Sequence, residues 1–137
     1  MSLLQWSASL DVGVGSMNRE HHVLIGLMNV LWEADRRGAP RPELLSALKK
    51  LGDYTVEHFE HEERMLAAIR FPQLATHRRI HANLLGELKA YVDAFAVSED
   101  ARLPKKLFTF LKLWLTAHIR GIDIKYSALA QSKGLAA

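Results

Sequence analysis

Apolar side chains recur along this chain at alternating steps of three and four residues. One such stripe consists of Leu44, Leu48, Leu51, Thr55, His58, Glu62, Met65 and Ile69. Three similar stripes run from His21 to Leu31, from Leu74 to Phe95 and from Leu107 to His118. This spacing keeps the side chains on one face of a helix, which can then pack against neighbouring helices. The pattern therefore predicts four amphipathic helices.

Turn-forming residues set the expected ends of these helices. We expect an extended arm over residues 1–17, anchored by Trp6, and helices over residues 18–37, 42–69, 73–96 and 101–129. Asn18 can cap the first helix, and Gly38 ends it. Short connections between long helices favour antiparallel neighbours. The sequence thus predicts one all-α domain over residues 1–137, an up-down-up-down antiparallel four-helix bundle with an extended N-terminal arm.

Five histidines and two acids stand at positions that a helix bundle normally fills with apolar side chains. They are His21, His58, Glu62, His77, His81, His118 and Asp123. Burying one unpartnered imidazole or carboxylate costs roughly 1–3 kcal/mol. Several such groups would threaten a domain whose total stability is about 5–15 kcal/mol. We therefore expect the seven side chains to share a metal centre.

The spacing of these residues suits ligation from helix faces. Two pairs are four residues apart, His58 with Glu62 and His77 with His81. The members of such a pair point the same way from one helix. His118 and Asp123 are five residues apart, which requires either a local widening of the helix, such as a π-bulge, or an acid that reaches in from the flank.

Other polar residues nearby serve as internal controls. His22 and His61 each lie one position off a stripe, so we expect both at the surface. On the same grounds we expect Glu57, Glu60 and Glu63 to face outward. The predicted centre therefore uses five of the seven histidines.

The absence of cysteine limits the kind of metal centre. It excludes zinc–thiolate sites and iron–sulfur clusters, so any metal takes nitrogen and oxygen ligands. If each carboxylate bridges two metals, the seven side chains supply nine bonds, and an oxo or hydroxo bridge supplies two more. One of the twelve positions of two octahedral ions then stays open for a small ligand. Iron, manganese, zinc and copper all suit such ligands, whereas the Glu-x-x-His motif of ferritin-like proteins does not occur in the chain.

Composition narrows the expected partners. The net charge of +3 is small, and the basic pairs fall on different predicted helices, so we expect no nucleic acid partner. No apolar stretch is long enough to span a membrane, and no signal peptide is recognisable, so we expect no membrane association and a cytoplasmic location. The sequence does not specify a protein partner.

Four segments, HHVLIGLMNVL, DYTVEHFEHEERM, FPQLATHRRIH and FLKLWLTAHIRGID, closely resemble bacterial hemerythrins, and the resemblance covers residues 6–126. It implies two iron ions (Fe²⁺/Fe³⁺) joined by an oxo or hydroxo bridge. One iron would be held by His77, His81 and His118. The other would be held by His21 and His58 and would carry the open position, while Glu62 and Asp123 would bridge the two. Dioxygen would bind end-on at the open iron as hydroperoxide, and azide or similar anions would bind at the same place.

The resemblance also bears on two local features. The five-residue spacing between His118 and Asp123 is the normal one in this family. The family often has Asp three residues before the first histidine, where this chain has Asn18.

Apolar neighbours of the candidate ligands are expected to surround the ligand site. Leu24, Phe59, Leu115 and Ile119 all fit ordinary core packing, and we expect them also to line the dioxygen pocket. A dry pocket would slow oxidation of the iron. Trp114 shares a stripe with His118 and is expected to pack against the cluster. Tyr126 lies three residues after Asp123 and is expected to hydrogen-bond a carboxylate there.

The leading hypothesis for function is reversible dioxygen binding for transport, storage or supply, without enzymatic activity. No titratable residue lies on the stripes beyond the seven candidate ligands, although an enzyme usually needs a placed acid or base. A di-iron enzyme that acts on peroxide or nitric oxide, or as a ferroxidase, is the first alternative. An oxygen sensor, in which ligand binding alters a partner contact, is the second.

Overall fold

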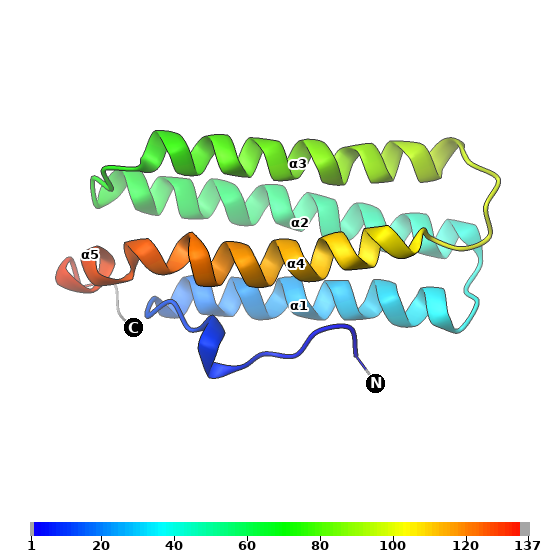
Figure 1. Ribbon diagram of the computed structural model, residues 1–137, viewed down its shortest axis with the longest axis horizontal. Coiled ribbons are helices and arrows are strands. Elements are labelled where there is room, and N and C mark those ends of the chain that lie inside the picture. Colours follow the sequence, from blue (N-terminus) through cyan, green and yellow to red (C-terminus); the bar gives the residue numbers. More distant parts are fainter. Residues whose placement is uncertain (1, 135–137) are drawn as a thin grey trace.

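A computed structural model describes residues 2–134, which form a bundle of four long helices (Figure 1). The helices are α1 (Gly15–Arg36), α2 (Arg41–Ala68), α3 (Leu74–Val97) and α4 (Lys105–Gly121). Successive helices run in opposite directions, which confirms the predicted all-α, up-down-up-down fold. Within residues 2–134 there is no β-strand, and no helix is both long and apolar enough to cross a membrane.

The N-terminal arm lies against the bundle and contains one short 3₁₀ helix, η1 (Ala8–Leu10). Its backbone is fixed at Leu4, whose N–H donates to Asn29 Oδ1 over 3.0 Å, while Asn29 Nδ2 donates to the Leu4 carbonyl over 2.8 Å. The Trp6 ring stacks on the His22 ring, with centroids 4.0 Å apart. The arm is therefore held by paired hydrogen bonds as well as by its expected aromatic anchor.

The first helix begins at Gly15 rather than at residue 18, and the prediction that Asn18 caps it was wrong. Asn18 Oδ1 instead accepts a hydrogen bond from the Val12 N–H over 3.0 Å, and its Nδ2 donates to Asp11 Oδ1 over 2.8 Å. The same Asp11 oxygen accepts the N–H of Gly13, which has a φ of 73° that suits glycine. Asn18 thus ties the arm to the first turn of α1.

The fourth helix is shorter than expected, because it spans Lys105–Gly121 instead of residues 101–129. Pro104 is extended, with ψ at 140°, so the helix begins after it. At the other end, Gly121 has a low helix propensity, and α4 ends there. The chain continues as the 3₁₀ helix η2 (Asp123–Tyr126) and the short helix α5 (Ser127–Ser132). The bounds of α2 and α3 differ from expectation by one residue at each end, which is ordinary fraying.

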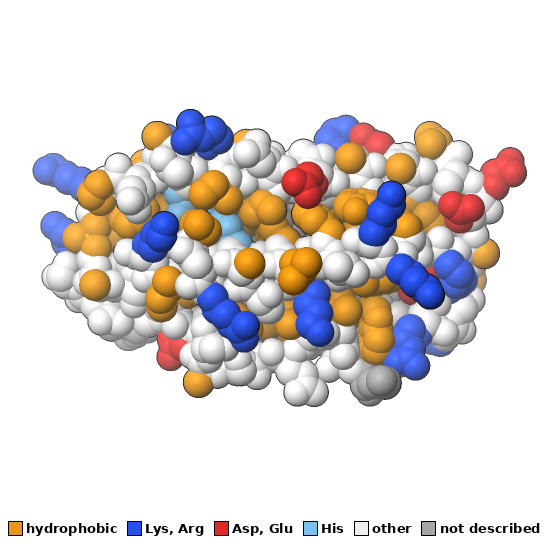
Figure 2. All heavy atoms as spheres, viewed as in Figure 1, with side chains coloured by type: hydrophobic (Ala, Val, Ile, Leu, Met, Phe, Trp, Pro, Cys, Tyr) orange, Lys and Arg blue, Asp and Glu red, His pale blue; other side chains and the backbone are white. Residues whose placement is uncertain are grey.

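The interior of the bundle changes character along its length. One end, called here the apolar half, is filled by fully buried apolar side chains that include Leu31, Leu44, Leu48, Leu107 and Leu111. The other end, called here the polar half, contains the seven candidate ligands among apolar neighbours. Histidine atoms are visible through the surface toward the left end of the molecule (Figure 2). The four helices therefore position a polar cluster at one end of an otherwise apolar core.

Candidate metal centre

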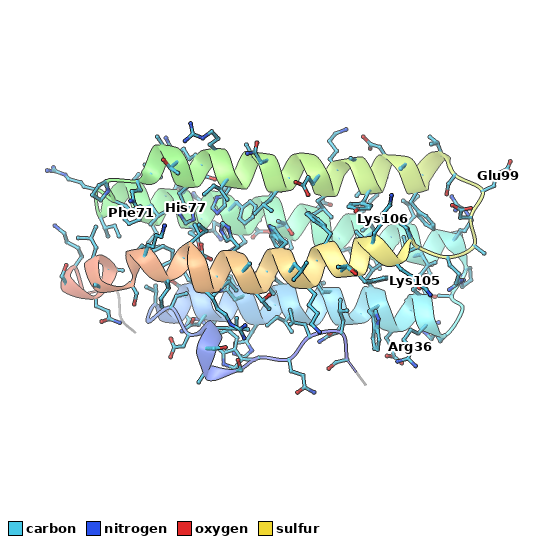
Figure 3. The ribbon with its side chains drawn as sticks, in the orientation of Figure 1. Arg36, Phe71, His77, Glu99, Lys105 and Lys106 are labelled. Carbon is cyan, nitrogen blue, oxygen red and sulfur yellow. The ribbon has the colours of Figure 1, made fainter. Side chains whose placement is uncertain are left out.

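The four helices and the turn after α4 all contribute to the polar cluster. His21 comes from α1, His58 and Glu62 from α2, His77 and His81 from α3, His118 from α4 and Asp123 from η2. All seven are buried, and none is more than 7% exposed. His77 lies on the first turns of α3, close to Phe71 of the preceding loop and far from Lys105 at the start of α4 (Figure 3). The structure thus brings together all seven residues that the sequence singled out.

Glu62 lies at the middle of the cluster, with its two oxygens facing different imidazoles. Its Oε1 is 2.7 Å from His77 Nε2 and 3.1 Å from His81 Nε2. Its Oε2 is 3.7 Å from His58 Nε2 and 3.8 Å from His21 Nε2. A carboxylate that offers one oxygen to each of two ligand groups has the arrangement of a bridge between two ions.

Asp123, from η2, likewise turns its two oxygens toward different imidazoles. Its Oδ1 is 3.0 Å from His118 Nε2 and 3.3 Å from His77 Nε2, and its Oδ2 is 3.3 Å from His21 Nε2. Ligand atoms within 4.8 Å of one another form two sets, which share Glu62. The first set contains Glu62, His77, His81, His118 and Asp123, and the second contains His21, His58 and Glu62.

The five-residue step from His118 to Asp123 is accommodated by the end of α4. The helix stops at Gly121, and the N–H of Ile122 closes the last turn by donating to the His118 carbonyl over 2.8 Å. Asp123 then opens the 3₁₀ helix η2 and turns its buried carboxylate inward. Of the two alternatives that the spacing allowed, the acid that reaches in from the flank is the one observed.

Several of these buried atoms have no hydrogen-bond partner among residues 2–134. They are both ring nitrogens of His21, the Nε2 atoms of His81 and His118, and both carboxylate oxygens of Asp123. Each unsatisfied buried group costs about 1–3 kcal/mol. Converging imidazole nitrogens and carboxylate oxygens are the donors that iron, manganese and zinc accept. The cluster can therefore hold a metal ion.

The electrostatics of the cluster keep its carboxylates ionised. Burial and the charge of Asp123 raise the pKa of Glu62, but the adjacent imidazoles of His77 and His81 outweigh them and lower it to about 2. Burial lowers the pKa of His77, but the neighbouring carboxylates of Asp123 and Glu62 raise it to about 9. Because a metal ion must displace the proton of an imidazole that it binds, metal binding at His77 competes with protonation of that ring.

Tyr126 hydrogen-bonds a carboxylate of the cluster, as the sequence suggested, and Trp114 packs against Phe59 beside the cluster. The Tyr126 hydroxyl donates a hydrogen bond to Glu62 Oε2 over 3.0 Å, and burial together with the charges of Glu62 and Asp123 raises the pKa of this hydroxyl well above its usual value. The Trp114 ring lies 5.9 Å from the Phe59 ring, which itself stacks on His81 at 3.7 Å. These contacts hold one oxygen of Glu62 and the imidazole of His81 in place.

The four apolar residues expected around the ligand site are all buried: Leu24, Phe59, Leu115 and Ile119. Phe59 is the one whose position is fixed by ring contacts. Its ring centroid is closer to that of His81, at 3.7 Å, than to that of His58, at 5.8 Å. Phe59 therefore packs chiefly against the larger ligand set.

Sequence reasoning missed two acids at this site. Glu20 hydrogen-bonds both His58 and His61, and Glu63 hydrogen-bonds His81. Glu63 was expected to face outward, but its side chain is hydrogen-bonded to the buried His81. His61 was expected at the surface, but its side chain is 35% exposed and hydrogen-bonded to Glu20. His22, in contrast, is exposed as expected. Both acids adjoin a candidate ligand in the sequence, which is the signal that could have pointed to them.

Comparison with known proteins agrees with this geometry. The family described as "Hemerythrin HHE cation binding domain" matches residues 12–130. The bacteriohemerythrin of Stenotrophomonas maltophilia is 31% identical over 127 residues, covering 93% of this chain and 81% of that protein. The myohemerythrin of Riftia pachyptila is 34% identical over 88% of each chain. A crystal structure of wild-type hemerythrin superimposes with a TM-score of 0.86 at 26% identity, covering 93% of this chain and 98% of that one.

Proposed function

Because this chain belongs to the hemerythrin family, we propose that it binds dioxygen reversibly at a di-iron centre in its polar half, as a carrier, store or local supplier of oxygen. The observation that carries this proposal is the division of seven buried ligands into two sets that share Glu62. An iron pair bound there would supply the electrons that dioxygen takes up on binding and returns on release. All other steps depend on how the side chains hold and shield this pair.

The two ligand sets differ in size, and this difference indicates which iron would have the open position. His77, His81 and His118 would hold one iron, and His21 and His58 would hold the other. Glu62 and Asp123 each direct one oxygen to His21 and the other to the larger set, so both would bridge. The iron held by two imidazoles would have one fewer protein ligand, and this iron would carry the position for dioxygen.

Apolar packing supports reversible binding over further reaction. Leu24, Leu115 and Ile119 are at most 2% exposed, so water has little access to the helix faces that carry His21 and His118. A dry surrounding slows the loss of charged oxygen species from the metal. We propose that these three residues line the dioxygen pocket.

The surrounding polar contacts favour a carrier over an enzyme. The titratable side chains that touch the seven ligands include Glu20, Glu63 and Tyr126, and each of the three is already hydrogen-bonded to one of them. A general acid or base needs to reach a substrate. These groups are instead engaged in holding the centre itself.

An oxygen titration of the iron-loaded, chemically reduced protein tests the proposal. We expect one dioxygen to be taken up per two irons, with a coloured product that fades under argon and returns with air. Azide should compete for the same position in the oxidised protein. Continuous oxygen consumption in the presence of a reductant, with no reversible adduct, would show an enzyme and overturn the proposal.

A further inference from the structure

Two of the buried imidazoles are hydrogen-bonded to a carboxylate through Nδ1, the ring nitrogen that faces away from the centre. Glu20 Oε1 lies 2.7 Å from His58 Nδ1, and Glu63 Oε2 lies 2.9 Å from His81 Nδ1. In both rings the other nitrogen, Nε2, faces Glu62. A carboxylate that accepts a hydrogen bond from the Nδ1–H group fixes the tautomer in which Nε2 has a free lone pair. Both imidazoles are therefore prepared to bind a cation on the Glu62 side.

Each of these carboxylates is itself held by a second partner. Glu20 Oε2 is 2.9 Å from His61 Nδ1, and Glu63 Oε1 is 3.4 Å from Arg78 Nε. The two carboxylates are largely shielded from water, with side chains 18% and 25% exposed. Since both oxygens of each acid are engaged, neither carboxylate can rotate away from its histidine without losing a second contact.

The two pairs also connect different helices. Glu20 lies on α1 and its partner His58 on α2, whereas Glu63 lies on α2 and its partner His81 on α3. No carboxylate within residues 2–134 contacts the Nδ1 atom of the other three buried imidazoles, which are His21, His77 and His118. Each ligand set therefore has a single charged acceptor behind it, Glu20 for the smaller set and Glu63 for the larger.

We propose that Glu20 and Glu63 are positioning residues of the metal centre, each of which orients one ligand histidine and supplies negative charge to one ion. This inference rests on the proposed function. The charges of Glu20, Glu63, Glu62 and Asp123 together match the four positive charges of two divalent cations. The centre thus extends beyond its seven ligands to two acids that lie off the apolar stripes.

Iron retention by matched variants tests this assignment. Glu20→Ala and Glu63→Ala should each bind iron(II) roughly 10–100-fold more weakly than the parent chain, as measured under argon by transfer to a coloured chelator. Glu20→Gln and Glu63→Gln keep an acceptor oxygen but lose the charge, so their loss should be smaller. Glu60→Ala is the control, because Glu60 is an exposed acid on the same helix as Glu63. Alanine variants that retain both irons as tightly as the Glu60→Ala control would overturn the proposal.

A second measurement reports on orientation rather than affinity. In the zinc-loaded protein, ¹⁵N NMR should show Nδ1-protonated rings for His58 and His81, with Nδ1 protons that exchange slowly with water. Glu20→Gln should speed exchange at His58 alone, and Glu63→Gln at His81 alone. Unchanged exchange in both variants, with native far-UV circular dichroism, would contradict the positioning role. A parent chain that binds no metal pair would instead overturn the proposed function.

Discussion

The two halves of the bundle are built from the same four helices and the same residue spacing, yet different interactions stabilise them. In the apolar half, side chains such as Leu44, Leu48 and Leu107 are completely buried against one another, and the hydrophobic effect alone favours that arrangement. In the polar half, the same positions hold imidazoles and carboxylates, several of which lack hydrogen-bond partners among the described residues. The same helical periodicity therefore builds both halves. The polar half becomes a candidate metal site because imidazoles and carboxylates replace the apolar side chains there.

The largest effect should follow from removing the acid at the middle of the polar half. Glu62 contacts four imidazoles with its two oxygens. Glu62→Ala should therefore lower the affinity for at least one iron by more than about 100-fold, beyond the range expected for outer residues. Iron per chain after desalting measures this. Full retention of two irons would show that Glu62 does not bridge, and Glu60→Ala supplies the matched control.

Truncation of a side chain in the apolar half should lower the stability of the fold but leave the iron content unchanged. Leu48 is fully buried, far along the bundle from the metal ligands. Leu48→Ala should cost about 2–5 kcal/mol of unfolding free energy, because it removes apolar contacts and leaves a cavity. Iron content per folded chain should not change. Urea unfolding together with a metal assay checks both parts, and a loss of iron without a loss of stability would show that the halves are not separable.

The metal-free protein should depend on pH through its polar half. The pKa of Glu62 falls from 4.5 to about 2 on folding, so its contribution is complete above pH 4.5 and is lost as the pH falls through 2. The pKa of His77 rises from 6.5 to about 9, so its contribution is complete below pH 6.5 and is lost as the pH rises through 9. Maximum stability is therefore expected between pH 4.5 and 6.5.

Thermal unfolding of the metal-free and the iron-loaded protein, measured from about pH 2 to about pH 10, tests this expectation. Iron loading should abolish the alkaline decline, because a bound Nε2 carries no proton that could be lost. If the Tm of the metal-free protein stays level between pH 6 and 10, the His77 contacts contribute nothing to stability. Leu48→Ala should lower the whole curve without changing its shape.

The smallest effect is expected at the edge of the cluster. Tyr126→Phe removes the hydroxyl that donates to Glu62 Oε2 but keeps the buried ring. A hydrogen bond to a charged group contributes about 1.5–3 kcal/mol, so metal-free stability should fall by roughly this amount while both irons remain bound. Urea unfolding and the metal assay measure the two effects. Loss of an iron from this variant would place the hydroxyl closer to the ions than its contact with Glu62 implies.

The sequence predicted the fold and the meeting of the six polar residues on the four helices because both depend on one helix face at a time. The step of three and four residues places His58 and Glu62 on the same inward stripe as Leu48, whatever the partner helix is. The helical period alone did not identify Glu20 and Glu63, although each adjoins a candidate ligand, since their contacts depend on how two neighbouring helices are rotated about their axes. That rotation is set by packing across the whole bundle, which the period of a single helix does not specify.

Helix ends were the other source of error, and they affected the site. The step from His118 to Asp123 was ambiguous until the end of α4 at Gly121 showed that the acid enters from a 3₁₀ turn. Asn18 fitted the preferences of a cap, but its side chain bonds the arm instead. In both cases a local preference competed with tertiary contacts that stabilise another backbone path.

Six side chains from the four helices and Asp123 from η2 are proposed to bind a pair of iron ions jointly. Reconstitution with ⁵⁷Fe, followed by a metal assay and Mössbauer spectroscopy of the oxidised protein, tests it most directly. We expect two irons per chain that are magnetically coupled through a shared bridge. One iron per chain, or two irons that behave as isolated ions, would contradict it.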